Sequence, residues 1–285
     1  MKTSRTIAAA LLLVVALPAP AAGDDALVFG VFPRRNATET VRMFTPMASH
    51  LAEQLGRKVS VVTARDFEAF WQGINGRRYD IVHYNQYHYI RSAQNYQVIA
   101  YIEEGGKSTI SGALYVRRDS GITDLAQLKG RTVLFGGGED AMISYITNMY
   151  LLLQAGLKRD DIKSVFAVNP PNSVLALHRR QADAAGAGDG ALELPVVANA
   201  IDTRELTALK VSEPLLQLPV AVKRDMAPKL RAAIQATLVG LKDSEAGQQV
   251  LKAAVMTGLG KAEDKDYDPH RRIVRAVMGP DPARR

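Results

Sequence analysis

Residues 113–136 read ALYVRRDSGITDLAQLKGRTVLFG, and they place a strand, a polar turn, a short helix and a second strand in close succession. Residues 113–119, which open with four apolar residues, predict the first strand, 122–130 predict the helix, and 131–138 predict the second strand. Strands and helices also alternate over residues 26–85, and that order implies parallel strands with right-handed crossovers. The stretch therefore predicts an α/β fold.

The same alternation extends to both sides of this stretch. Gly56 and Gly156 each follow an apolar helical run and are expected to end it. Before residue 113, strands are expected at 26–33, 58–64 and 79–85, with helices at 39–56 and 66–76. After residue 138, a helix is expected at 140–156, then strands at 162–168 and 182–188 around a helix at 172–181, and a mostly helical C-terminal third. A ligand is expected at the carboxyl ends of these strands.

The composition limits the chemistry that is available. The chain has 285 residues, a formal charge of +7 and no cysteine, which excludes disulfides, thiolate metal sites and cysteine nucleophiles. Its length favours two lobes or one large domain. Its basic pairs are scattered along the chain, whereas a nucleic-acid surface needs them clustered with stacking aromatics. We therefore expect no nucleic-acid partner.

Residues 1–22 have the pattern of a secretory signal peptide. Lys2 and Arg5 precede an apolar run that is too short to span a bilayer, and small residues follow that run. Cleavage after Ala21 is favoured, because the small residue Ala19 stands two positions before it. No later apolar run reaches membrane length. We therefore expect the mature protein in the periplasm.

Four stretches resemble the type II periplasmic solute-binding proteins, specifically the branch of ABC-transporter proteins that binds phosphate, phosphite and phosphonate. Residues 113–136 are the most specific of them, because their strand, turn, helix and strand follow at the family's spacing. The other three are LVFGVFP at 27–33, YDIVHYNQYHYIRSA at 79–93 and VLALHRRQADAAGAGD at 174–189.

The resemblance implies a two-lobe clamshell of the α/β class, in which each lobe is a mostly parallel sheet flanked by helices. Lobe one would combine residues 24–110 with 220–285, and lobe two would be 111–219. A small-molecule ligand would lie in the cleft, and the lobes would close around it by a hinge motion. A membrane permease would recognise the closed form. The resemblance implies no catalysis, cofactor or metal, and we expect a monomer.

The turn before the helix of lobe two is the first candidate site. Phosphonate-binding relatives have a Ser-Thr-Ser run here, where the chain has Glu139 and Asp140 followed by two apolar residues. Backbone groups of the glycines could hold an anion or a neutral ligand, but unit charges 4 Å apart repel by about 1 to 4 kcal/mol, so Asp140 would oppose a phosphonate. Asp140 could instead pair with a cationic amine or only cap the helix. The candidate residues are Gly136, Gly137, Gly138, Asp140 and Ala141.

A second candidate group follows the third strand of lobe one. Tyr84, Asn85 and Gln86 stand at the carboxyl end of that strand, where a phenol and two amides could orient a ligand. Packing within the loop is the alternative role. His83 and His88 lie in the same stretch, but their spacing differs from a helical metal-binding pair, so packed or exposed histidines are expected.

Three further residues complete the candidate ligand site. Arg34, after the first strand, could hold a negative ligand group or be only solvated. Asn172 stands where the family opens a helix, as a pocket donor or as an ordinary cap. Asp189 follows small residues that would let a ligand approach or would serve tight packing. The histidine that relatives carry before this helix is replaced by the run Asn169 to Pro171.

The leading hypothesis is the periplasmic solute-binding component of an ABC-type importer, carrying a small polar ligand. The alternative on the same fold is a ligand-sensing or accessory module that delivers its ligand to a membrane receptor or redox system. An enzyme is disfavoured, because the sequence has no Gly-x-Ser-x-Gly elbow and no strong metal pattern.

Overall fold

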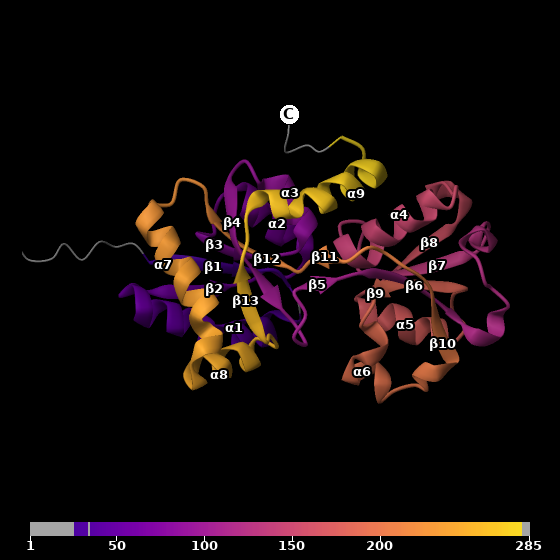
Figure 1. Ribbon diagram of the computed structural model, residues 1–285, viewed down its shortest axis with the longest axis horizontal. Coiled ribbons are helices and arrows are strands. Elements are labelled where there is room, and N and C mark those ends of the chain that lie inside the picture. The colour runs from indigo at the N-terminus through magenta and orange to yellow at the C-terminus, as the bar shows by residue number, and fades with distance from the viewer. Residues whose placement is uncertain (1–25, 34, 281–285) are drawn as a thin grey trace, which may run out of the picture.

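A computed structural model describes residues 26–33 and 35–280, which form two α/β lobes side by side (Figure 1). Each lobe is built on one sheet with helices against it, and a two-stranded ladder lies between the lobes. The expected signal peptide and the candidate Arg34 lie outside the described residues.

The sheet of lobe one has six strands in the order β13, β4, β12, β3, β1, β2. Strands β2, β1 and β3 run parallel, while β12 pairs antiparallel with β3 and β4, and β13 pairs antiparallel with β4. The bounds are β1 (Leu27–Val31), β2 (Val59–Val62), β3 (Ile81–His83), β4 (Tyr96–Glu103), β12 (Pro219–Lys223) and β13 (Gly258–Lys261).

The sheet of lobe two has five strands in the order β10, β6, β9, β7, β8. Strands β8, β7 and β9 run parallel, and β6 pairs antiparallel with β9 and β10. The bounds are β6 (Gly112–Arg117), β7 (Thr132–Gly136), β8 (Lys163–Ala167), β9 (Ala184–Gly188) and β10 (Leu206–Val211).

Both sheets are therefore mixed: most strands of each sheet run in one direction, as expected, and the others run antiparallel to them. The parallel pairs join strands that are separated by a helix in the sequence. The antiparallel pairs involve the strands that carry the chain into or out of a lobe, namely β4, β6, β10 and β12. A strand that arrives from the other lobe enters its sheet from the opposite end, so it runs against its neighbours.

Nine α-helices surround the two sheets in the described part of the chain. They are α1 (Ala37–Leu55), α2 (Phe67–Asn75), α3 (Gln86–Ser92), α4 (Thr147–Gln154), α5 (Pro170–His178), α6 (Pro195–Ala198), α7 (Pro228–Val239), α8 (Glu245–Ala253) and α9 (Asp268–Met278). A π-helix, η3 (Met142–Ile146), leads directly into α4. Helix α3 and strand β4 were not expected from the sequence.

Local sequence explains where the first helix begins and ends. The side chain of Asn36 accepts a hydrogen bond from the backbone N–H of Glu39, which caps α1. Gly56 has a φ of 61° and ends the helix, as expected. The helix expected at 122–130 is only a 3₁₀ turn, Leu125–Leu128, which Asp124 caps.

The two crossings between the lobes pair with each other. Strand β5 (Thr109–Ile110) leads into lobe two, β11 (Leu215–Leu216) leads out of it, and the two form the antiparallel ladder between the lobes. Side chains from lobe one hold the second crossing, since Gln86 Nε2 donates to the carbonyl oxygen of Leu216 and Tyr267 Oη donates to that of Gln217. We call this ladder between the lobes the hinge ladder.

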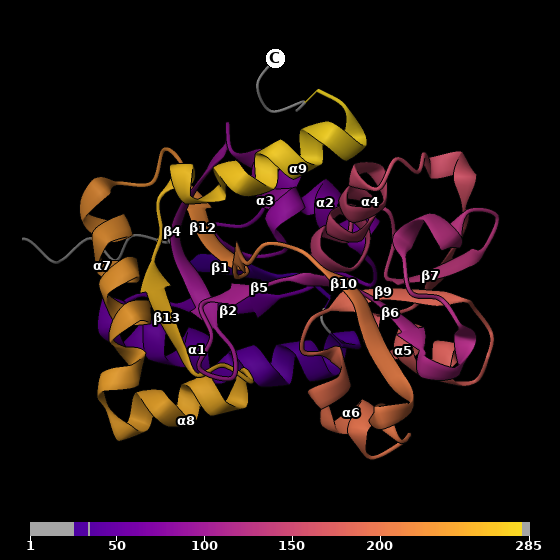
Figure 2. The same ribbon diagram turned by 45° about the vertical axis from the view of Figure 1, so that its right-hand side comes forward.

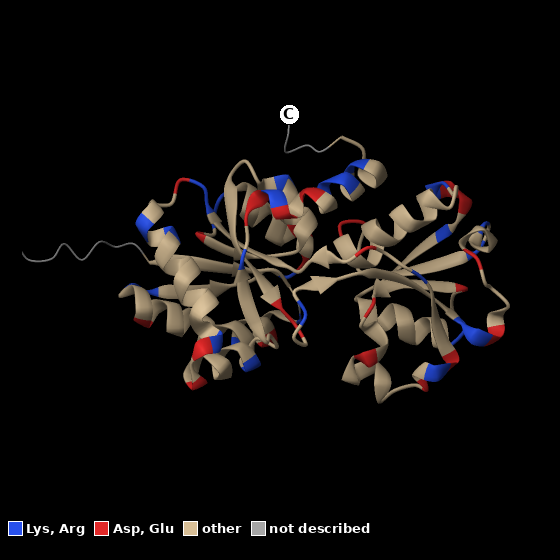
Figure 3. Cartoon of the chain, in the orientation of Figure 1, with Lys and Arg blue, Asp and Glu red and all other residues tan. Residues whose placement is uncertain are grey.

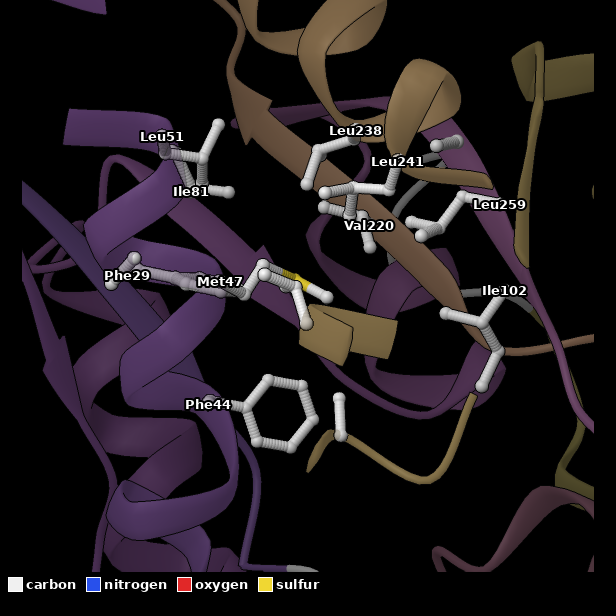
Figure 4. Close-up of a cluster of buried hydrophobic side chains, with 14 of the residues drawn as sticks. Phe29, Phe44, Met47, Leu51, Ile81, Ile102, Val220, Leu238, Leu241 and Leu259 are labelled. Atoms are coloured by element: carbon white, nitrogen blue, oxygen red, sulfur yellow. The ribbon is translucent and has the colours of Figure 1, made fainter. Parts of the chain in front are cut away.

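The core of lobe one shows how the end of the chain completes the first half. Phe44, Met47 and Leu51 of α1 pack in one buried cluster with Leu238 and Leu259, which come from the C-terminal segment (Figure 4). Burial of large apolar side chains of this kind stabilises a fold by about 1.5 to 3 kcal/mol each. Lobe one therefore needs both the N-terminal and the C-terminal part of the chain.

The last helix does not keep to lobe one, where residues 220–285 were expected. Helix α9 lies across the top of both lobes in Figures 1 and 2. Ile273 and Val274 are buried in the same cluster as Ile146 and Met149 of lobe two. The amphipathic helix buries its apolar side against α4 and η3, so the C-terminal segment links the two lobes.

Candidate ligand site between the lobes

Two of the candidate groups meet across the boundary between the lobes. The side chain of Asn85, just before α3 in lobe one, donates from Nδ2 to the backbone oxygen of Asp140 in lobe two at 3.2 Å. His88 Nε2 lies 3.0 Å from Asp140 Oδ2. The carboxyl end of β3 and the turn after β7 therefore come together, as the carboxyl-end rule anticipates.

Asn85 holds this arrangement by acting on both lobes. It is the N-cap of α3, with its Oδ1 accepting from the backbone N–H of His88 at 2.9 Å. Its amide nitrogen remains available for Asp140. One side chain thus fixes the start of α3 and contacts the opposite lobe.

His88 is the residue at this contact that sequence reasoning did not select. Its ring stacks on Trp71 at 5.6 Å with an interplanar angle of 21°, and lies 5.7 Å from the ring of Phe67. The Arg91 guanidinium covers Trp71 at 4.0 Å from the ring centroid. This aromatic packing therefore orients the imidazole toward lobe two. His88 stands three residues after Asn85, which is the spacing between a helix N-cap and the residue whose N–H it accepts, and this spacing was the available sequence signal.

Asp140 faces lobe one and does not cap its own helix. The N-cap of η3 is Ala141, which has no side-chain hydrogen bond, so the capping role considered for Asp140 was wrong. Burial alone would raise the pKa of Asp140, but the hydrogen bond and charge of His88, with a smaller contribution from Arg91, lower that pKa overall. The carboxylate is therefore held in its charged form.

The glycines before Asp140 serve the turn itself. A Cβ on Gly136 would come within 2.2 Å of the Cα of Pro170, so only glycine lets the start of α5 approach β7 this closely. Gly137 has a φ of +93°, and its N–H donates to the oxygen of Ala167 at 2.8 Å. Gly138 is exposed, and its oxygen accepts from the N–H of Ala141 at 3.0 Å. Ligand contact by these residues stays a prediction.

The first turn after Asp140 is wider than an α-helix and is held by polar side chains. Asn148 Nδ2 donates to the oxygens of Ile143 and Ser144 and also to that of Ala187 in β9, at 3.0 to 3.1 Å. Thr147 Oγ1 donates to the oxygen of Met142 at 2.8 Å. Such π turns leave carbonyls that need other partners, and they are frequent at functional sites.

Tyr84 and Gln86 lie apart from this contact. Tyr84 is completely buried in the core of lobe one, its hydroxyl lies 3.0 Å from Ser92 Oγ, and burial raises its pKa well above the ordinary value. Gln86 is also buried and donates to the hinge at Leu216. These placements favour the packing alternative for both residues over a role in holding ligand.

The two remaining candidates have other partners in lobe two. Asn169, not Asn172, caps α5, because the two prolines that follow it suit the first helical positions and start the helix earlier than expected. Asn172 itself is exposed. Asp189 Oδ1 accepts from the N–H of Ser111 at 3.2 Å, which ties the end of β9 to the crossing between the lobes.

Hollows are also present on the described surface away from this boundary. Two hollows of about 430 and 440 Å³ are lined by residues of lobe one alone, the first between α1 and α8 and the second between β4 and α7. Charges of both signs are interspersed over both lobes (Figure 3). Within residues 26–33 and 35–280, no group of three acidic or histidine side chains could hold a metal ion, and no helix is long and apolar enough to cross a membrane.

Known structures share this fold over nearly the whole chain. PhnD1 from Prochlorococcus marinus, solved in complex with methylphosphonate, superposes with a TM-score of 0.76 at 18% identity, covering 90% of this chain and 99% of that one. A Xanthomonas citri protein solved with ATP gives 0.76 at 18% identity, with 89% and 97% covered. The binding protein of an ABC phosphonate transporter from Pseudomonas aeruginosa gives 0.74 at 16% identity, with 89% and 86% covered.

The sequence itself matches one protein family over residues 29–267, that of the periplasmic substrate-binding proteins of phosphonate ABC transporters. This match confirms the resemblance and the two-lobe α/β fold inferred from the sequence. Proteins of this family bind a substrate for a permease and are not enzymes. The chain therefore belongs to the periplasmic substrate-binding protein family of phosphonate ABC transporters.

Proposed function

We propose that this protein captures a small polar ligand between its two lobes and presents it to the permease of an ABC importer, without catalysing any reaction. The observation that carries the proposal is the meeting of Asn85 and His88 of lobe one with Asp140 of lobe two. A ligand held at this boundary would contact both lobes at once, so its binding would favour the closed arrangement.

The ligand class follows from the family and from the side chains at the boundary. Similar folds hold methylphosphonate and ATP, which suggests a ligand that carries a phosphonate or phosphate group. The carboxylate of Asp140 is paired with His88 through a hydrogen bond, and Arg91 lies near it, so the repulsion expected from the sequence is reduced. A phosphonate-like or other small polar ligand is therefore the proposed cargo.

The setting of the protein is part of the same proposal. Residues 1–22 would direct export and be removed after Ala21, leaving a periplasmic protein that works as a monomer. The family works with ABC permeases, so the expected partner of the closed form is a membrane permease. The hinge ladder of β5 and β11 would allow the change between open and closed forms.

Ligand screening of the protein without residues 1–21 tests this function. The screen would measure melting temperature with phosphate, phosphite, methylphosphonate, simple carboxylates and amines. A true ligand at 100 times its dissociation constant should stabilise the protein by about 2.7 kcal/mol. Replacing Asn85 with alanine should weaken that ligand by about five- to tenfold, because it removes a hydrogen-bonding amide at the boundary.

The matched control is Ser244→Ala, which also removes a helix cap but lies on α8, remote from lobe two. It should change stability without changing ligand affinity. If none of the compounds stabilises the protein, or if both cap variants bind a ligand equally well, the proposed site is wrong.

A further inference from the structure

The carboxylate of Asp140 already occupies the donor that lobe one offers at the boundary. His88 is 1% exposed, and its Nε2 is aimed at Asp140 by the rings of Trp71 and Phe67. The Asn85 amide binds the backbone of the same aspartate. Lobe one therefore binds Asp140 of lobe two through two separate side chains, those of His88 and Asn85.

The neighbouring carboxylate shows that this arrangement is specific to Asp140. Glu139 is exposed and faces Arg159 within lobe two, with 3.4 Å between Arg159 Nη1 and Glu139 Oε2. The two acids stand next to each other in the sequence but have partners in different lobes. Of these two acids, Asp140 is the one that contacts lobe one.

We propose that Asp140 is a built-in latch and a determinant of ligand charge, because its carboxylate occupies His88 and its backbone oxygen occupies the Asn85 amide, the two donors that an anionic ligand group would otherwise fill. An anion that approached His88 would either have to displace Asp140 or lie within a few ångströms of its charge. The inference rests on the proposed function for its ligand part, whereas the latch concerns the protein alone.

The proposal gives two linked expectations. Without ligand, the lobes should be held closed by the pair between His88 and Asp140. With ligand, the wild-type protein should bind weakly to compounds whose anionic group must accept a hydrogen bond from His88. Removing the charge at position 140 should increase the affinity for these compounds. The buried Nδ1 of His88 has no hydrogen-bond partner among the described residues, so Nε2 is the nitrogen through which the ring acts.

Asp140→Asn tests both expectations, with Glu139→Gln as its matched control. Each variant removes one negative charge from the same turn, but only Asp140 contacts lobe one. The chain has no cysteine, so cysteines introduced as Gln54→Cys in α1 and Gln154→Cys in α4 can carry spin labels that report the distance between the lobes.

In the absence of ligand, Asp140→Asn should give a longer or broader distribution of distances than Glu139→Gln, and His88→Gln should give the same result as Asp140→Asn. In calorimetric titration with methylphosphonate, Asp140→Asn should bind at least about tenfold more tightly than Glu139→Gln, which corresponds to about 1.4 kcal/mol.

Equal distance distributions in Asp140→Asn and Glu139→Gln would overturn the latch. Equal affinities in the two variants would overturn the role in ligand charge. Complete lack of binding by every protein would instead count against the proposed function and against the charge role together, and the distance measurement would still decide the latch.

Discussion

His270 shows how one buried side chain connects the C-terminal helix with the hinge. It is fully buried in α9, and its Nε2 donates to the backbone oxygen of Leu216 in the crossing strand at 3.1 Å. Its ring lies 5.0 Å from that of Tyr267. Burial is the main cause that lowers the pKa of His270 to about 4, while the hydrogen bond to Leu216 opposes this shift.

This lowered pKa makes the free energy of unfolding depend on pH. Above about pH 6.5 the imidazole is neutral in both the folded and unfolded states, and its contribution is complete. As the pH falls from 6.5 toward 4, His270 binds a proton in the unfolded chain but not in the folded protein. The free energy of unfolding should therefore fall by about 2 to 3 kcal/mol.

Urea unfolding between pH 7.5 and 4.5 measures this slope. His270→Gln can keep a donor to Leu216 but cannot titrate, so it should lose most of that part of the pH dependence. His50→Gln, at a partly exposed position of α1, is the control and should keep the wild-type slope. A slope that is unchanged in His270→Gln would refute the assignment.

At the scale of the element, the π turn η3 is held by a polar side chain, that of Asn148. A π turn widens the helix and leaves carbonyls without their usual partners. Asn148 lies one turn further along and is completely buried, and its Nδ2 reaches the oxygens of Ile143, Ser144 and Ala187. It thereby joins η3 to β9 and supports the turn that carries Asp140.

Replacing Asn148 with alanine should destabilise the protein by about 1 to 3 kcal/mol, because buried carbonyl oxygens lose their donor. Chemical denaturation measures this loss. Gln154→Ala, on the exposed face of the same helix, should change stability by no more than about 0.5 kcal/mol. Equal effects of the two substitutions would show that Asn148 does not support the turn.

At the scale of the whole molecule, the lobes are joined in three ways. The hinge ladder of β5 and β11 lies between them, the contact of Asp140 with His88 joins them at the candidate site, and α9 packs on η3 and α4 of lobe two. Because α9 follows directly on elements of lobe one, its packing resists separation of the lobes. Under the proposed function, opening of the lobes would have to break the packing of the apolar side of α9.

Ile273→Ala tests this dependence. The side chain is fully buried with residues of lobe two, so its truncation should lower stability by about 2 to 5 kcal/mol and let the lobes separate more. Small-angle scattering without ligand should give a larger radius of gyration. Arg275→Ala, on the exposed face of α9, should change neither quantity, and an unchanged radius in Ile273→Ala would rule out the role of α9.

Much of the fold could be predicted because its signals are local. Gly56 ends α1 through its own backbone conformation, and the strand, helix and strand pattern of residues 113–136 needs only neighbouring residues to be read. The mixed order of the sheets could not be predicted in this way. Whether β6 and β12 run with or against their neighbours depends on how the chain crosses between the lobes.

The residues of the candidate site also differ in how far the sequence could predict their positions. Asn85 and Asp140 both follow strands, and the structure brings them into contact at the boundary between the lobes, whereas their contact with a ligand stays a prediction. Tyr84 stands beside Asn85 but points into the core, and His88 reaches a partner 52 positions away. No local pattern distinguishes those two outcomes.

The sequence by itself determined the α/β class and the family, and it marked the strand ends at which we propose a ligand site, because periodicity, caps and motifs act over a few neighbouring residues. Only the tertiary structure decided that His88 faces Asp140, that Tyr84 is a core residue and that α9 spans both lobes. Those facts depend on which side chains from distant segments pack together, and the sequence of one segment alone does not determine its packing partner.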